Sequence, residues 1–215
     1  MSLITVGYSL AAWAWWWAVA QNATDDFAYA LSQAGDLAKR SNRLNDTTGM
    51  SNLVIAQIHL LNREHDLALA ASGQALEVRP NCHASYAVRA NILNYAGRSA
   101  EAVELARYAI RLCPVYPAFY AAVLAGAYYG SGMYAEAADV AGTSLESDPN
   151  NLDALLMAAA ANAARQRFGD AKAAAREVRR AKPDFSAEKY AAKQPYKDPH
   201  KVEQFMRMLE KAGLK

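Results

Sequence analysis

The stretch "ALEVRPN" at residues 75–81 decides the fold, because similar phrases recur at a nearly fixed interval. "AIRLCPV" (109–115), "SLESDPN" (144–150) and "EVRRAKPD" (177–184) follow it along the chain. A proline just after a helix blocks continuation of that helix, so each phrase predicts a helix end. The prolines are Pro80, Pro114, Pro149 and Pro183, spaced by 34, 35 and 34 residues. A period of this length is typical of a stack of helical repeats.

Small residues recur in step with these prolines. One alanine precedes each proline by 24 residues and another precedes it by 12 residues. Small side chains at fixed positions allow two antiparallel helices to approach closely, and Gly97 and Gly132 fall in the expected turns between such helices. The alanines are Ala56, Ala90, Ala125 and Ala159, together with Ala68, Ala102, Ala137 and Ala171.

The pattern resembles the tetratricopeptide repeat. In the copy at 83–116 the matching residues are Tyr86, Ala90, Gly97, Ala102, Ala109 and Pro114, whereas Arg89 and Leu93 replace the usual leucine and tyrosine. The resemblance implies an all-α fold, a right-handed superhelix of about five helix-turn-helix repeats with a C-terminal capping helix. The expected array covers 1–185, with repeats at 3–48, 49–82, 83–116, 117–151 and 152–185, and a linker and capping helix follow at 186–215.

The amino-acid composition agrees with an all-α chain, and the distribution of charge limits the classes of partner to be expected. Hydrophobic residues make up 53% of the 215 residues, and many of them are alanine, which favours helices. The net charge is +2, although residues 165–215 hold 14 basic and 7 acidic residues. A basic tail can meet nucleic acid or anionic lipid. Here the basic residues are mixed with acids and alanines, so we expect a solvated helix face and no nucleic-acid partner.

The sequence offers little for catalysis or metal binding. Cys82 and Cys113 form no CxxC pair, and no second pair of ligands accompanies Cys82 and His83. His59 and His65 pair with no serine, cysteine or carboxylate at catalytic spacing. We therefore expect no catalytic residues, no metal and no cofactor, and the cysteine usage fits a reducing, cytoplasmic location.

The segment "LAAWAWWWAVAQ" at 10–21 lies in an uncharged run that extends to Asp25. Such a run can span a membrane or act as an export signal. No basic residue precedes it and it contains Thr5, Gly7 and Ser9, so a first repeat helix at 3–21, followed by a second at 25–42, is the favoured interpretation. A membrane-tethered or exported repeat protein is the alternative.

The aromatic residues of this first helix predict self-association. Trp13, Trp16 and Trp17 have helical spacing and are expected to pack on the next two helices, whereas Trp15 faces the other way. Terminal repeats normally need a polar outer face. This chain begins with its most apolar helix, which predicts a piece of a longer protein, and an exposed apolar strip favours a homodimer through the tryptophan-rich helix.

The partner site expected from the repeat register is the concave groove lined by the first helix of each pair. Asparagine amides there can bind the backbone of an extended peptide, and tyrosines offer rigid contact area. The sequence therefore predicts a protein or peptide partner in this groove. The candidate residues are Gln57, Asn91, Asn94, Tyr95, Phe119 and Tyr129.

Longer phrases carry a narrower resemblance. Residues 90–114 and 118–140, and the ending "QPYKDPHKVEQFMRMLEKAGLK", are similar to the repeat region that follows the catalytic domain in bacterial class III adenylate/guanylate cyclases. The resemblance implies a non-catalytic regulatory tail. The alternative is that the parent chain is a nucleotide cyclase, active in signalling, with its catalytic domain outside these residues.

Overall fold

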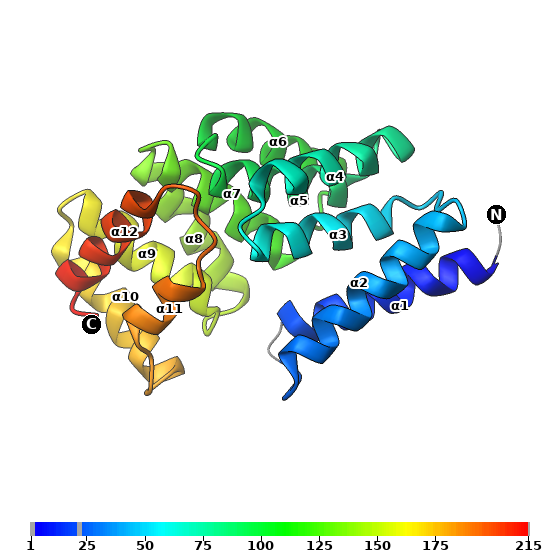
Figure 1. Ribbon diagram of the computed structural model, residues 1–215. Coiled ribbons are helices and arrows are strands. Elements are labelled where there is room, and N and C mark those ends of the chain that lie inside the picture. The colour runs from blue at the N-terminus through cyan, green and yellow to red at the C-terminus, as the bar shows by residue number, and fades with distance from the viewer. Residues whose placement is uncertain (1–2, 21–22, 215) are drawn as a thin grey trace.

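The computed structural model describes residues 3–20 and 23–214, and its regular structure in these ranges is entirely helical (Figure 1). Consecutive helices pack against one another along most of the chain, so the molecule is a stack of antiparallel helix pairs. The helices are α1 (Leu3–Ala20), α2 (Phe27–Arg43), α3 (Met50–Leu61), α4 (His65–Val78), α5 (His83–Tyr95), α6 (Ser99–Leu112), α7 (Ala118–Gly130), α8 (Tyr134–Ser147), α9 (Leu152–Ala164), α10 (Phe168–Ala181), α11 (Ala187–Lys193) and α12 (Pro199–Ala212).

The repeated alanines form the contacts between paired helices. All eight are buried, with exposures between 0% and 2%. Four lie on the first helices α3, α5, α7 and α9, and four lie on the second helices α4, α6, α8 and α10. Each pair therefore closes on small side chains, while larger residues such as Ile92, Leu93 and Leu156 fill the space beside them.

The turn between the two helices of each of these four pairs contains one residue with a left-handed backbone conformation. Only two of the four turns have glycine at this position. Gly97 and Gly132 have φ values of 85° and 79°. The equivalent residues of the other two turns are Arg63 and Gln166, with φ values of 62° and 61°. A left-handed backbone costs a non-glycine residue about 1–2 kcal/mol. The turn geometry is therefore set by the helix pair and imposed on whichever residue occupies it.

Helix α1 packs on α2 and α3 through one narrow stripe. The stripe contains Thr5, Ser9, Ala12, Trp16 and Val19. Asp26 caps the start of α2, where its side chain accepts a hydrogen bond from the Tyr29 amide at 2.9 Å. The expected first and second helices at 3–21 and 25–42 therefore lie close to where the structure has α1 and α2.

The tryptophans are turned differently from the expectation. Trp16 is buried and Trp13 is half-buried, but Trp17 is 49% exposed, and Trp15 packs edge-on against the Tyr29 ring at 5.7 Å. Each residue turns about 100° around a helix axis. Trp13 and Trp15 therefore flank the buried stripe on opposite sides, and Trp17 points away. The expectation that Trp17 packs inward and Trp15 faces away was wrong.

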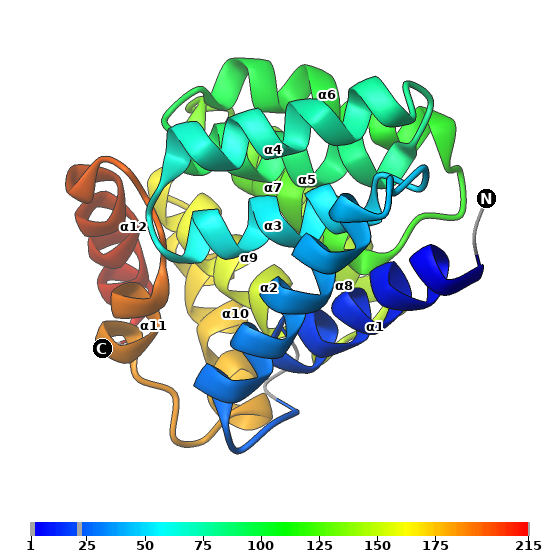
Figure 2. The same ribbon diagram turned by 45° about the vertical axis from the view of Figure 1, so that its right-hand side comes forward.

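The C-terminal part contains one helix that the sequence did not predict. The short α11 lies in the region expected to be a linker, and Ser186 caps it by accepting a hydrogen bond from the Lys189 amide at 3.2 Å. Helix α12 packs on α9 and α10, where Leu209, Ala212 and Leu214 are buried. Figures 1 and 2 show α11 and α12 at the opposite end of the stack from the α1–α2 pair.

Candidate functional site

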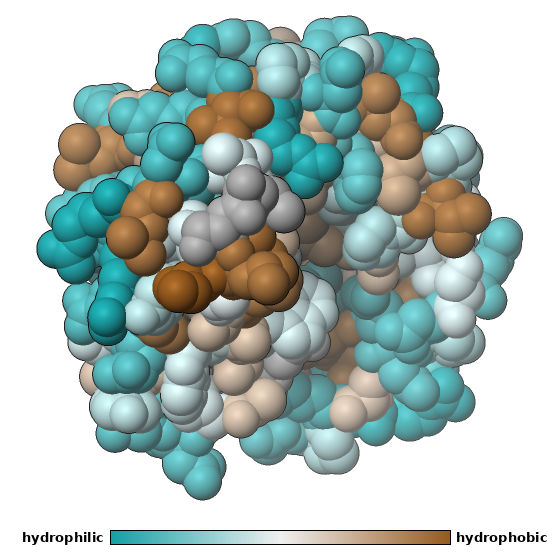
Figure 3. Space-filling model, turned by 90° about the vertical axis from the view of Figure 1, so that its right-hand side faces the viewer, coloured by the Kyte–Doolittle hydropathy of each residue, from teal (hydrophilic) through white to brown (hydrophobic). Residues whose placement is uncertain are grey.

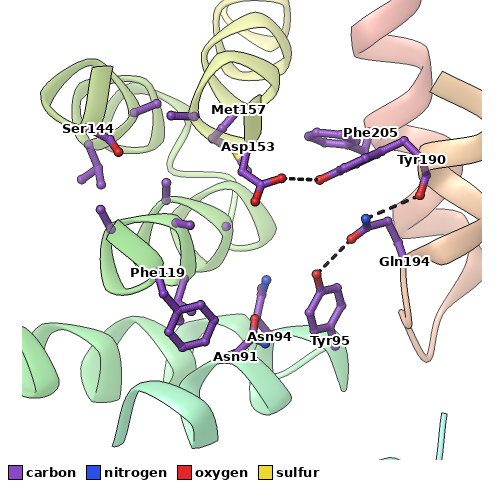
Figure 4. Close-up of a pocket in the computed structure, with 18 of the residues that line it drawn as sticks. Asn91, Asn94, Tyr95, Phe119, Ser144, Asp153, Met157, Tyr190, Gln194 and Phe205 are labelled. Atoms are coloured by element: carbon purple, nitrogen blue, oxygen red, sulfur yellow. Dashed lines mark hydrogen bonds between the residues drawn. The ribbon is translucent and has the colours of Figure 1, made fainter. Parts of the chain in front are cut away.

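A cavity of about 220 Å³ lies on the concave side of the stack (Figure 4). Helices α5, α7 and α9 form one wall together with part of α8. The other wall comes from α11, from Phe205 of α12 and from residues 194–198 between them, which we call the C-terminal strap. The groove is therefore built from the first helices of three pairs and is bordered by a segment that follows them in the chain.

Four of the six predicted groove residues line this cavity: Asn91, Asn94, Tyr95 and Phe119. Gln57, on α3, is 6% exposed and is not among the lining residues. Tyr129 is 7% exposed, and its ring packs against Tyr134 and Phe205 at 5.2 and 5.4 Å. Both Gln57 and Tyr129 are therefore packed inside the fold.

Asn94 connects two helix pairs. Its side chain is 5% exposed, and its Oδ1 accepts a hydrogen bond from Ser99 Oγ at 2.8 Å. Gly130 of α7 passes so close that an added Cβ would lie 2.7 Å from Asn94 Oδ1. This asparagine thus fixes the spacing of α5 and α7, whereas Asn91, one turn earlier, is half-buried at the cavity wall.

Tyr95 is half-buried and bonded to the strap. Its hydroxyl donates to Gln194 Oε1 at 2.9 Å, and its ring meets the Tyr196 ring edge-on at 4.7 Å. Burial raises the pKa of the Tyr95 phenol above its usual range, and burial also raises the pKa of Tyr196 to about 12. Both phenols therefore stay protonated at neutral pH and act as hydrogen-bonding groups.

The charged group of the cavity is Asp153 at the start of α9. Its side chain is open to water in the cavity but is otherwise surrounded by protein, and burial raises the pKa of its carboxyl above the usual value. The hydroxyl of Tyr190 donates a long hydrogen bond of 3.5 Å to Asp153 Oδ1 (Figure 4). This hydrogen bond lowers the pKa of the carboxyl and so opposes the larger effect of burial. Burial raises the pKa of Tyr190 as well.

This arrangement is suited to binding. Apolar atoms of Ala122, Val123, Met157 and Phe205 line the cavity beside the Asn91 amide and the Asp153 carboxylate. Small-molecule and peptide sites commonly combine apolar walls with a few polar groups that fix orientation. Within residues 3–20 and 23–214, no group of three or more His, Cys, Asp or Glu side chains is placed to hold a metal ion.

The residues contributed from the far end of the chain were not predicted from the sequence. Tyr190, Gln194 and Tyr196 meet residues of α5 and α9 that are distant in sequence. Repeat spacing reports contacts between neighbouring units, and it carries no signal for a segment that folds back across several of them. The closeness of Tyr190, Tyr196 and Phe205 in an otherwise alanine-rich, charged tail was the available hint.

Comparison with solved structures identifies the fold. PilW, a widely conserved type IV pilus biogenesis factor, matches with a TM-score of 0.74 at 16% identity, over 99% of this chain and 90% of PilW. PilF of Pseudomonas aeruginosa matches with a TM-score of 0.66 at 15% identity, over 96% of this chain and 90% of PilF. YrrB, a TPR protein with an unusual peptide-binding site, matches with a TM-score of 0.57 at 18% identity, over 81% of this chain and 90% of YrrB.

The predicted fold class, a right-handed superhelix of tetratricopeptide-type helix pairs with a C-terminal capping helix, is confirmed. No family model and no curated protein matches the chain. At these identities the likeness establishes the fold alone.

Proposed function

We propose that this chain is a non-catalytic interaction module that binds a segment of a partner protein in the concave cavity. The observation that carries the proposal is the cavity itself, in which apolar walls stand beside the Asn91 amide and the Asp153 carboxylate. Superhelices of this kind present extended concave surfaces that bind other chains. The likeness to YrrB, a TPR protein with an unusual peptide-binding site, supports the same use of the fold.

The test is selection of ligands from a displayed peptide library, followed by a variant that fills the cavity. Ala122 is half-buried at the cavity wall, so Ala122→Trp places an indole in the space that a ligand would occupy. The matched control is Ala135→Trp, on the exposed face of α8. We expect the selected peptides to lose at least tenfold in affinity for Ala122→Trp and to keep their affinity for the control. Equal binding to all three proteins would place the ligand outside this cavity.

A second proposal concerns the parent chain. The phrase "PYKDP" and the ending "KAGL", which resemble the terminus of bacterial nucleotide cyclases, form the strap, the start of α12 and the left-handed Gly213 at its end. The solved structures above give this parentage no support. Sequencing the reading frame upstream of Met1 tests it, because a catalytic domain there would identify the chain as the tail of a cyclase. A different upstream sequence would exclude it.

The role of α1 is also a proposal. This helix is long and apolar enough to span a membrane, but signal sequences and core helices meet the same criterion, and 28% of it is buried in the structure. Its partly buried face and exposed apolar face are those of a helix at the end of a superhelix. We favour self-association of two copies through α1 over membrane insertion. A cytoplasmic location stays a prediction.

A further inference from the structure

The strap lies on the superhelix in the way that a bound peptide would. The amide of Lys197 donates to the carbonyl of Tyr95 at 2.9 Å. That carbonyl belongs to the last residue of α5, where helix carbonyls lack a partner within the helix. Arg63 Nη1 donates to the carbonyl of Tyr196 at 3.2 Å, and Nη2 donates to that of Ala192 at 3.5 Å. Two of these three contacts reach backbone groups of the strap and the third reaches the last turn of α11, so the surface binds main-chain groups whatever their side chains.

Arg63 is held in an unfavourable conformation at this contact. Its φ of 62° is that of the turn position where two other pairs use glycine. Gln166 has nearly the same φ at the equivalent turn, so what distinguishes Arg63 is the contact that its side chain makes. At this position the arginine side chain reaches the Tyr196 carbonyl of the strap and the Ala192 carbonyl of α11, both more than 120 residues away in sequence.

Side chains around the strap select its composition. The Tyr196 ring packs edge-on against Tyr95, and Pro195 is buried beside it. Lys197 Nζ lies 3.6 Å from Asp66 Oδ1 in an ion pair exposed to solvent. Such a pair adds little affinity, but it favours a cation over an anion at this point. The surface is thus suited to an aromatic residue followed by a basic one.

The strap leaves part of this surface unused. His65 is 5% exposed, and neither of its ring nitrogens has a hydrogen-bond partner among the described residues. It borders a hollow of about 420 Å³ that Arg63, Asp66, Tyr196 and Lys197 also line. Both nitrogens are themselves buried, so they do not reach into the hollow, and the space that the strap leaves open is the hollow itself.

The strap can detach from the surface while the helices on either side of it, α11 and α12, stay folded and packed. Its neighbours Ala192 and Lys193 are exposed, as are Lys197 and Asp198. The helices on either side are anchored separately, α11 by Ala187 and α12 by Leu209, Ala212 and Leu214, all 0–1% exposed. Local opening of residues 194–198 would uncover Pro195 and the Tyr196 ring and expose the surface, while the buried anchors of α11 and α12 stay in place.

We propose that the surface formed by Arg63, Asp66 and Tyr95 is a peptide-binding site which the strap occupies in the resting protein. Its external ligand is an extended segment that carries an aromatic residue followed by a lysine or arginine. This inference rests on the proposed function as an interaction module and assigns it a second surface and a ligand class. The ligand and the strap exclude each other. A tethered strap has an effective concentration of the order of millimolar, so it competes strongly with a free ligand.

The experiment offers the strap sequence as a separate peptide. The probe is a fluorescent peptide with the sequence YAAKQPYKDP, residues 190–199. It is titrated by anisotropy against the full-length wild-type chain and against a strap variant, Tyr196→Ala with Lys197→Ala, whose binding surface is unchanged. We expect the strap variant to bind the peptide at least tenfold more tightly than wild type does. Adding Arg63→Ala to the strap variant should abolish the gain, and a peptide with alanine in place of its second tyrosine should not bind.

Other outcomes overturn the inference. Equal affinity for wild type and the strap variant would show that the strap does not block a site. Binding that persists after Arg63→Ala would place the peptide elsewhere. If the double substitution prevents folding, Gln194→Ala, which removes only the hydrogen bond to Tyr95, should raise the affinity in the same direction. Loss of library-selected peptides in Ala122→Trp alongside no binding of the strap peptide would leave the proposed function intact and refute this inference alone.

Discussion

Arg63 combines an unfavourable backbone with a contact to the strap, and these two properties can be separated by substitution. In Arg63→Gly the left-handed turn is relieved, so the free energy of unfolding should stay the same or rise by up to about 1 kcal/mol. The hydrogen bonds from the guanidinium to the Tyr196 carbonyl of the strap and to the Ala192 carbonyl of α11 are lost at the same time. We therefore expect amide hydrogen exchange of Gln194 and of residues 196–198 to become at least tenfold faster without loss of global stability.

Gln166→Gly is the matched control, because Gln166 occupies the equivalent turn between α9 and α10 with nearly the same φ. It should give the same change in stability and leave exchange of the strap unaltered. If amide hydrogen exchange of the strap becomes faster in both variants, or in neither, Arg63 does not hold the strap in place.

Asp153 gives the candidate site a dependence on pH. Because burial raises the pKa of this carboxyl above 3.8, the folded state binds more protons than the unfolded state between pH 3.8 and the folded pKa. Ionisation of Asp153 therefore lowers the free energy of unfolding as the pH rises through that window. Asp153→Asn cannot ionise, so its stability relative to wild type should increase with rising pH and be smallest below pH 3.8. Urea unfolding across pH 3 to 7 measures this difference, with Asp139→Asn on the exposed face of α8 as control. A difference that shrinks as the pH rises would contradict the assignment.

At the scale of elements, the contact between paired helices depends on the size of one residue in each. Ala90 is fully buried between α5 and α6, so Ala90→Leu forces extra volume into a closed contact. Overpacking of this kind costs about 1–3 kcal/mol. Thermal unfolding should show a clear fall in midpoint for Ala90→Leu. Ala100→Leu, on the exposed side of α6, should leave the midpoint nearly unchanged. An unchanged midpoint for Ala90→Leu would mean that the repeat register is wrong.

The helix pairs could be predicted from sequence because each depends on residues within one period. Because proline, alanine and turn positions recur together, the boundaries of a repeat that departs from the pattern can be assigned from the other repeats. The orientation of α1 lacked this support, since its helix has no second copy to compare. Spacing alone placed Trp13, Trp16 and Trp17 on one side, but the buried stripe is centred between Ala12, Trp16 and Val19, which leaves Trp17 outside it.

Of the two walls of the cavity, the sequence predicted only the one formed by the first helices of the repeats. Asn91, Asn94, Tyr95 and Phe119 follow from the register of first helices, and they line the cavity. The opposite wall depends on where α11 and α12 dock, which is decided by the apolar stripe of α12 and by contacts such as that of Lys201 Nζ with the Gly130 carbonyl at 3.3 Å. No local pattern encodes such a contact, because its two partners are 71 residues apart.

At the scale of the whole molecule, the outer face of α1 is an exposed apolar surface at one end of the stack. The exposed residues Leu3, Gly7, Leu10, Ala14 and Trp17 follow one another at intervals of four and three, which forms a straight strip along the helix. Figure 3 faces the side of the molecule on which Figure 1 shows the start of α1, and brown, hydrophobic surface is exposed there. Large and small residues alternate along the strip, and an added Cβ at Gly7 would meet nothing within 4 Å.

This alternation makes the strip complementary to itself. When two copies of α1 pack antiparallel, Trp17 of one copy can face Gly7 of the other, and Leu10 can face Ala14. Each contact then occurs twice, as a two-fold interface requires. The same strip would be exposed in a monomer, and exposed apolar strips of this kind favour association. We therefore expect a dimer whose population rises with protein concentration.

Leu10→Asp tests this expectation, because it introduces a charge at the centre of the strip, where Leu10 is 52% exposed. Sedimentation velocity should show wild type passing from monomer to dimer as its concentration rises, and Leu10→Asp should stay monomeric. The control is Leu67→Asp on α4, because Leu67 is equally exposed at 53% and lies far from α1 in sequence. It should dimerise as wild type does, since the substitution adds the same charge without touching the strip. A wild-type chain that stays monomeric at all concentrations, but binds lipid vesicles through residues 3–20, would show that the apolar face meets a membrane instead of a second copy.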